Sequence, residues 1–168
     1  TFTGPGTFTV SAVAVCAANN QVSHLVVAGG GGGGYCAGGA GGAGGFRENK
    51  SPVTPYTASP LDGQPSAPNR VTVTAQAYPI TVGGGGAGSN SNSAAGTSGV
   101  NSIFDTITSH GGGGGGSRSS PKCGVAGGSG GGDSADIPVS PAGGAGNTPP
   151  VSPAQGQPGG GRTSPPHN

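Results

Sequence analysis

The chain has 168 residues and a formal net charge of +1, and 41 of its residues are glycine and 16 are proline. Only 7% are charged, so the chain lacks both the high net charge typical of disordered proteins and the basic cluster that nucleic-acid binding needs. Trp and Met are absent, so an ordinary apolar core cannot offset the entropy lost on ordering. Backbone groups of the glycine runs must therefore bond to each other, which favours a structural material over a linker.

The N-terminus reads TFTGPGTFTV, in which turn residues separate two β-forming triplets. This predicts a hairpin about Gly4–Gly6, and the segments 10–15 and 22–28 continue the strand signal. We therefore expect residues 1–28 to form a short β unit. Residues 29–168 are expected to form a glycine-rich domain with polar loops, continuous with that unit as one module.

Farther along, residues 51–69 hold too much proline for an interior strand and predict an extended loop. Residues 70–82, RVTVTAQAYPITV, alternate like a strand and end in GGGGAG. Residues 100–110 again indicate a strand, and six glycines follow them directly. Helical periodicity is absent, so the expected fold is mostly irregular and β, without an α-helix.

The glycine runs have three possible interpretations. A flexible linker does not explain why the three strongest runs each follow a β segment. A phosphate-binding loop would need a Gly-Lys-Ser/Thr ending and a following helix, and neither is present. The third interpretation is a set of packed polyglycine-II helices. The runs that this interpretation makes structural are bounded by Gly29 and Gly34, Gly83 and Gly86, and Gly111 and Gly116.

A polyglycine-II helix has about three residues per turn and no internal hydrogen bonds. Its N–H and C=O groups point outward, so several such helices can bond side by side. Glycine is needed because a Cβ at a contact face would hold the backbones apart, as at the collagen axis. Ala37, Ala40 and Ala43 recur every three residues, which predicts that they line one edge of such a helix.

The order of these elements carries a resemblance. The stretches HLVVAGGGGGGYCAGGAGGAGGFR, YPITVGGGGAG, GVNSIFDTITSHGGGGGG and GNTPPVSPAQGQPGGGR resemble the glycine-rich domain of phage tail-fibre and related virion proteins. The resemblance covers Phe2 to Arg162. It implies a layered sandwich of polyglycine helices with variable loops at its tip that contact a host receptor, and a trimeric fibre. The proline-rich insertion and the cysteines depart from the family pattern, which leaves the place in the virion open.

Residues suited to catalysis or metal binding are scattered. The three histidines have no Cys or Asp at metal-ligand spacing, and the five carboxylates form no acid–base pair. We therefore expect no enzyme activity, no metal and no cofactor. Of three cysteines, Cys36 and Cys123 each follow a six-glycine run and are the preferred pair for a disulfide, with free thiols as the alternative.

Surface recognition is the expected activity, because loops on a rigid scaffold carry function. The loops 46–69, 89–99 and 117–125 are the candidates, and solvated turns are the alternative for each. The residues expected to contact a receptor are Arg47, Tyr56, Asp62, Asn90 and Arg118.

The resulting hypothesis is a non-enzymatic virion structural and adhesion protein, a phage tail-fibre segment located on the virion or outside the cell. It would self-associate as a homotrimer or a filament and bind a host glycan or protein, without nucleic acid or membrane insertion. Two alternatives remain: a subunit of an extracellular glycine-rich filament, and a capsid decoration protein.

Overall fold

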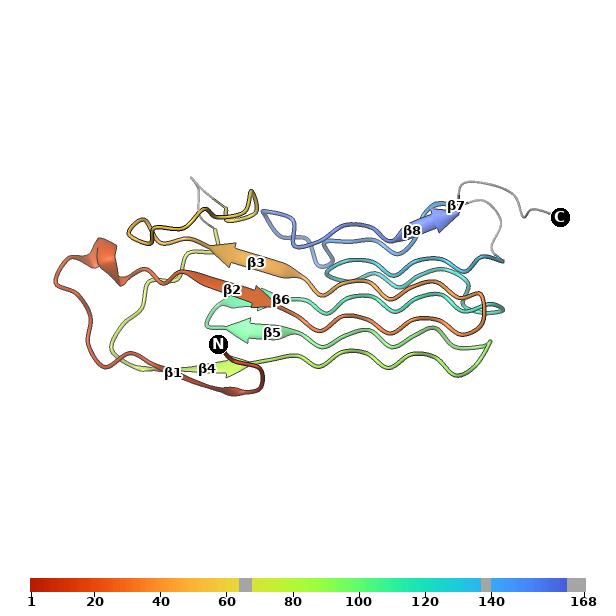
Figure 1. Cartoon of the computed structure of the whole chain (residues 1–168), viewed down its shortest axis with the longest axis horizontal. Coiled ribbons are helices and arrows are strands. Elements are labelled where there is room, and N and C mark those ends of the chain that lie inside the picture. Colours follow the sequence, from red (N-terminus) through yellow and green to blue (C-terminus); the bar gives the residue numbers. More distant parts are fainter. Residues whose placement is uncertain (64–67, 137–139, 163–168) are drawn as a thin grey trace.

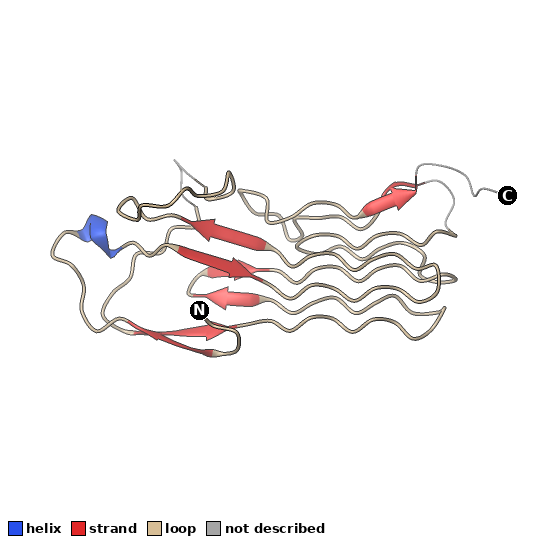
Figure 2. Ribbon diagram, in the orientation of Figure 1, coloured by secondary structure: helices blue, strands red, loops and turns tan. Residues whose placement is uncertain are grey.

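A computed structural model of the chain describes residues 1–63, 68–136 and 140–162. The molecule is elongated, with most strands at one end and long wavy segments that run side by side to the other end (Figure 1). Almost all of the far half is drawn as loop, since it contains neither α-helix nor long strand (Figure 2). The expected fold class, irregular and β without an α-helix, is confirmed for the described residues.

Four short antiparallel strands form the larger sheet, in the order β1-β4-β5-β6. Strand β5 and strand β6 form a hairpin in which Asp105 takes a left-handed conformation with φ of 52°. The bounds are β1 Gly6–Thr9, β4 Ala77–Thr81, β5 Ser102–Phe104 and β6 Ile107–Ser109.

Two further strand pairs and one short 3₁₀ turn complete the regular structure. Strand β2 (His24–Val27) pairs antiparallel with β3 (Phe46–Asn49). Strand β7 (Ser140–Ala142) pairs antiparallel with β8 (Gly160–Arg162) at the opposite end of the molecule. The 3₁₀ turn η1 covers Ala17–Asn20.

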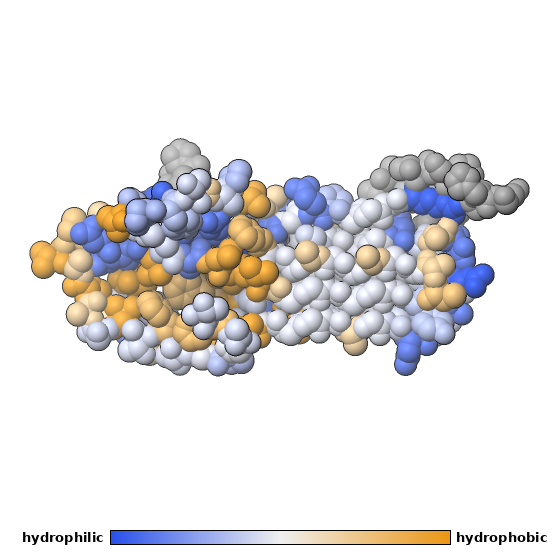
Figure 3. Space-filling model, viewed as in Figure 1, coloured by the Kyte–Doolittle hydropathy of each residue, from blue (hydrophilic) through white to orange (hydrophobic). Residues whose placement is uncertain are grey.

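The apolar core lies among the strands and is small. Phe104 is its centre: its ring lies 6.1 Å from the rings of Phe8 and Tyr78 and 5.3 Å from that of His24, in tilted or edge-on contacts that aromatic rings favour. Figure 3 shows apolar residues gathered over this half, whereas most of the other half is near neutral in hydropathy, with hydrophilic and some apolar residues at its far end. The buried members of the core are Val26, Val71, Val73, Tyr78, Phe104 and Ile107.

Three strands continue directly into glycine segments, as the sequence predicts. Strand β2 leads into residues 28–34, β4 into 83–89 and β6 into 111–117. We call the parallel and antiparallel segments of the far half glycine helices. In the described part of the chain they are glycine helix 1 (28–34), 2 (38–45), 3 (83–89), 4 (95–101), 5 (111–117), 6 (122–128), 7 (129–134), 8 (143–147) and 9 (156–159).

Hydrogen bonds between these segments recur every three residues. Ala28, Gly31 and Gly34 of glycine helix 1 donate their N–H groups to Gly45, Gly42 and Gly39 of glycine helix 2, at 2.8–3.1 Å. Among the described glycines only Gly63 has a positive φ. A period of three with negative φ and no bonds within a segment defines a left-handed polyglycine-II helix.

Glycine helix 5 is the centre of this lattice, and all its residues, 111–117, are buried. It bonds to glycine helices 1, 2, 4, 6 and 7, for example through Gly112 N to Gly29 O and Gly42 N to Gly113 O. Buried serines attach the lattice to the strands: Ser102 Oγ accepts from Gly83 N, and Ser109 Oγ donates to Val26 O. The strands thus fix the register in which the glycine helices begin.

The glycines expected to be structural have no room for a side chain. An added Cβ at any of them would lie 1.9–2.1 Å from a backbone oxygen of a neighbouring segment, closer than real Cβ atoms come. The six are Gly29, Gly34, Gly83, Gly86, Gly111 and Gly116. By contrast, Ala40 and Ala43 are exposed on glycine helix 2, as their three-residue spacing predicts. Ala37 is exposed too, but it lies in the preceding turn with a positive φ of 47° and not on the helix.

Two expectations for the N-terminus are wrong. The hairpin about Gly4–Gly6 does not form, because β1 instead pairs with β4, with Phe8 opposite Tyr78. The segment 10–15 is not a strand, and its Val13 and Val15 side chains are exposed. Residues 1–28 are therefore no separate β unit: both of their strands find partners later in the chain.

Candidate functional site

Loops gather at both ends of the molecule (Figure 1). The strand end carries residues 50–63 and 68–76, and the turn end carries the turns at 35–37, 90–94 and 118–121 that connect glycine helices. The receptor-contact residues expected from the sequence are divided between these ends. Asn90 and Arg118 lie at the turn end, and Arg47, Tyr56 and Asp62 lie at the strand end.

Arg47 is not a surface contact residue, so that expectation is wrong. It stands on β3, is buried, and donates from Nε to Asn69 Oδ1 at 3.0 Å. Asn69 is also buried and donates from Nδ2 to Glu48 O at 3.0 Å. Burial lowers the pKa of the Arg47 guanidinium. Arg47 therefore joins the end of the proline-rich loop to the β2–β3 pair.

Glu48, which the sequence analysis did not single out, fixes the start of the same loop. Its buried carboxylate accepts from Tyr56 Oη at 3.1 Å and from Ser59 N at 3.1 Å, and it also accepts from Ser59 Oγ. Burial and this hydrogen bond to Glu48 raise the pKa of Tyr56. The four residues of β3, Phe-Arg-Glu-Asn, show no apolar alternation, so the sequence offers no signal for this role.

An open groove of about 630 Å³ lies along the proline-rich loop, lined in part by Tyr56 and Asp62. Lys50 and Arg70 also line it, and Lys50 Nζ stands 5.7 Å from the centre of the Tyr56 ring. The structure thus brings two of the expected contact residues together with two cations, on a loop that Glu48 holds in place.

At the turn end, hydrogen bonds tie two turns together. Asn92 O accepts from Ser117 Oγ at 2.7 Å, from Ser119 N at 3.1 Å and from Ser120 N at 3.2 Å. Asn90, two residues earlier, is exposed. The turn at 90–94 is therefore held against the turn at 118–121 by backbone and hydroxyl groups.

Arg118 is exposed and makes the ion pair of this end. Its Nε donates to Asp136 Oδ2 at 2.8 Å, and Lys122 Nζ donates to Asp136 O at 3.1 Å. The hydrogen bond to Asp136 raises the pKa of Arg118. With the side chains about half exposed, this pair contributes little to stability and leaves a polar, solvent-accessible surface.

The expected disulfide between Cys36 and Cys123 is not present, since both cysteines and Cys16 are exposed free thiols. Cys36 lies in the turn at 35–37 with a left-handed φ of 42°, and its Sγ accepts from Arg118 Nη1 at 3.8 Å. The turn geometry directs this sulfur toward the Arg118 side chain.

Neither a metal centre nor a membrane span is found within the described residues. No group of three or more His, Cys, Asp or Glu side chains is close enough there to hold a metal ion. None of the helical segments described is long and apolar enough to cross a membrane. His24 packs edge-on against Phe104, and His110 lies against Gln155 at the base of the lattice.

The packed polyglycine-II helices and the short strands at one end define the class: a glycine-lattice domain without an α-helix in its described residues. A family model described as a glycine-rich domain matches residues 2–167, so the chain belongs to this glycine-rich domain family. Neither a search of curated proteins nor a search of solved structures finds a match.

Proposed function

We propose that the chain is a non-enzymatic virion structural and adhesion protein, a segment of a phage tail fibre that presents loops to the host surface. Its place would be on the virion or outside the cell, and its partner a host glycan or protein. The observation that supports this most is the rigidity of the scaffold, since a hydrogen-bonded lattice of glycine helices holds several turns at one end of the molecule. A rigid scaffold that holds exposed turns suits recognition.

The turn end is the better candidate for the contact surface. Its turns begin and end at lattice positions and are tied together through Asn92 O. Asn90 and Arg118 stand exposed there, and the Arg118–Asp136 pair offers both donors and acceptors. Sugar hydroxyls and polar protein surfaces are recognised by such groups.

Binding of the fluorescently labelled protein to a panel of bacterial cell envelopes tests the proposal. We expect binding to some envelopes, which Arg118→Ala and Asn90→Ala weaken about tenfold each. Tyr56→Ala, at the opposite end, is the matched control and should bind like the wild type. Failure to bind any envelope would refute adhesion, and loss of binding only in Tyr56→Ala would move the contact surface to the strand end.

A further inference from the structure

Glycine helix 7 has five bonded neighbours and one open direction. It donates N–H groups to glycine helices 2, 9 and 6 in turn, for example Ser129 N to Ala43 O, Gly130 N to Gln157 O and Gly131 N to Val125 O. It accepts from glycine helices 5 and 8, through Ser129 O and Gly131 O. Around this helix, directions into which its N–H groups point therefore alternate with directions into which its carbonyl groups point. The sixth, open direction is one into which carbonyl groups point.

The carbonyl groups left for that direction are those of Gly130 and Asp133. Neither oxygen accepts a hydrogen bond within the described part of the chain. Because N–H and carbonyl directions alternate around glycine helix 7, these two oxygens point between glycine helices 2 and 9. On the facing wall, Ala40 N and Ala43 N of glycine helix 2 likewise donate to no described group.

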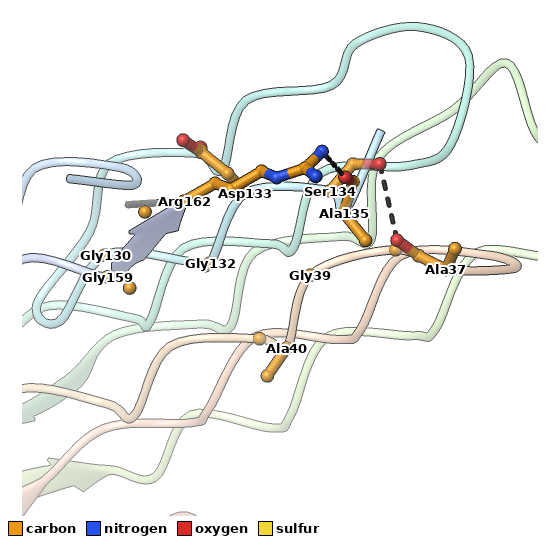
Figure 4. A pocket seen from close by; sticks show the side chains of 14 residues that line it. Ala37, Gly39, Ala40, Gly130, Gly132, Asp133, Ser134, Ala135, Gly159 and Arg162 are labelled. Atoms are coloured by element: carbon orange, nitrogen blue, oxygen red, sulfur yellow. Dashed lines mark hydrogen bonds between the residues drawn. The ribbon is translucent and has the colours of Figure 1, made fainter. Parts of the chain in front are cut away.

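Ala40, Gly130 and Asp133 line a groove of about 660 Å³. Figure 4 shows Gly39 and Ala40 along one side of it and Gly130, Gly132 and Gly159 along the other. A Cβ added to Gly132 would lie 3.4 Å from Ala40 N and 3.5 Å from Gly160 O, which is looser than at most lattice glycines. The groove is thus a vacant lattice position between glycine helices 2, 7 and 9.

The chain closes a similar vacancy elsewhere with its own groups. Glycine helix 5 also has five bonded neighbours and a sixth direction that no glycine helix fills. The N–H group of every third residue points in that direction. Gly111 N donates there to Asn101 Oδ1 at 2.9 Å, and Ser117 N donates to Pro121 O at 2.8 Å. Beside glycine helix 7 the chain does this only at the strand end, where Phe46 N donates to Gln155 O at 2.8 Å. Farther along the groove, no described group bonds to Ala40 N, Ala43 N, Gly130 O or Asp133 O.

An occupant must repeat every three residues to meet these groups, which only a polyproline-II-type segment does. The chain carries such a segment with an open edge. Within the described residues, glycine helix 3 bonds to no glycine helix other than 1 and 4. Its Gly84, Gly85 and Gly88 are exposed, and an added Cβ would meet nothing within 4 Å at Gly84 and only ordinary contacts of 3.6–3.7 Å at the others.

Contacts within one molecule do not explain why glycine, and not alanine, stands at these three positions. Glycine loses more entropy on ordering than any other residue, and alanine stands at exposed positions of glycine helix 2. A strand glycine without an internal reason marks a place where another backbone approaches. The edge also carries no charge, so its burial has no ionic desolvation cost.

We propose that the groove between glycine helices 2, 7 and 9 receives glycine helix 3 of a second copy of this chain. Ala40 N and Ala43 N would then donate to carbonyl groups of the incoming helix, and its N–H groups would donate to Gly130 O and Asp133 O. The two surfaces differ, so the contact is heterologous and each copy keeps one free groove and one free edge. Such contacts produce open polymers or rings. This inference does not depend on the proposed adhesion function.

Sedimentation velocity over a concentration series tests the contact. Gly160→Leu and Ala40→Leu place bulk at the groove, and Gly84→Leu places it on the edge, at positions that are exposed. Each should weaken association about tenfold or more. Ala126→Leu, on the exposed side of glycine helix 6, is the matched control and should associate like the wild type. An unchanged thermal midpoint shows that each variant is folded.

Mixing the variants separates this contact from any other. Gly160→Leu keeps an intact edge and Gly84→Leu keeps an intact groove, so an equimolar mixture should form a 1:1 complex that does not grow further. A wild type that stays monomeric at every concentration would overturn the proposal. Association that survives all three leucine variants, or a mixture without 1:1 complex, would also overturn it.

Discussion

At the scale of single residues, the lattice separates glycines that must be glycine from those that need not be. Gly32 and Gly33 are neighbours in glycine helix 1. A Cβ at Gly32 would lie 2.0 Å from Ala87 O, whereas one at Gly33 would lie 3.7 Å from Gly39 O. The composition alone cannot distinguish the two, since both lie in one run of six glycines.

We therefore expect Gly32→Ala to lower the free energy of unfolding by about 3 kcal/mol, because backbones would have to move apart. Gly33→Ala, the matched control, should be neutral or stabilise by about 0.5 kcal/mol through the unfolded chain. Chemical denaturation of both variants measures the difference. Equal effects would contradict the close packing of glycine helices 1 and 3.

His24 gives a second prediction at this scale. Burial lowers its pKa, as does Arg47, while the Val22 carbonyl and Glu48 act in the opposite direction. Its Nε2 is buried without a hydrogen-bond partner in the described structure. The unfolded chain therefore binds a proton at His24 more readily than the folded chain does.

Stability should accordingly fall as the pH drops below the ordinary histidine value of 6.5, until the folded chain is protonated as well. Thermal midpoints at pH 7.5 and pH 5.5 measure this fall, and His24→Phe should reduce it. An equal fall in the wild type and His24→Phe would show that other groups are responsible.

At the scale of elements, the sequence predicts those that depend on local pattern. The apolar segments ahead of glycine runs predict β2 and β4, although the alternating part of the segment 70–82 lies before β4 and residues 70–76 form no strand. The three-residue alanine spacing predicts the edge of glycine helix 2. The hairpin about Gly4–Gly6 is wrong because β1 gains more by pairing with β4, where Phe8 reaches Tyr78 and Phe104.

Strand β3 was missed for a related reason. Its residues Phe-Arg-Glu-Asn show no apolar alternation, and the last three are buried because they bond to distant groups. The sequence predicts Arg47 as a contact residue because it stands in the candidate recognition loop 46–69. Only the fold shows that Asn69 returns to cover it.

Glu48→Ala tests whether this strand holds the proline-rich loop. The change removes the acceptor of Tyr56 Oη and of Ser59 N, which we expect to cost about 1–3 kcal/mol locally. Limited proteolysis within residues 50–63 should become faster while the glycine helices stay protected. Thr57→Ala, an exposed change in the same loop, is the control, and equal cleavage of both variants would contradict the anchoring role.

At the scale of the whole molecule, two kinds of packing are joined end to end. The strand end is ordered by an apolar core about Phe104, and the far half by hydrogen bonds between backbones. Side-chain periodicity indicates the first kind, and within the lattice it indicates only the edge of glycine helix 2. The order of the lattice neighbours, and hence the vacancy beside glycine helix 7, follows from long-range pairing that no local pattern encodes.

Amide hydrogen exchange of residues 111–116 tests the central claim most directly. These N–H groups lie in the buried centre of the lattice, and Gly112, Gly113, Gly115 and Gly116 each donate to a neighbouring glycine helix. We predict that these four amides exchange about as slowly as those of the strands, near the limit of global unfolding. Exchange at the rate of an unstructured glycine peptide would mean that the run is a flexible linker and would contradict the lattice.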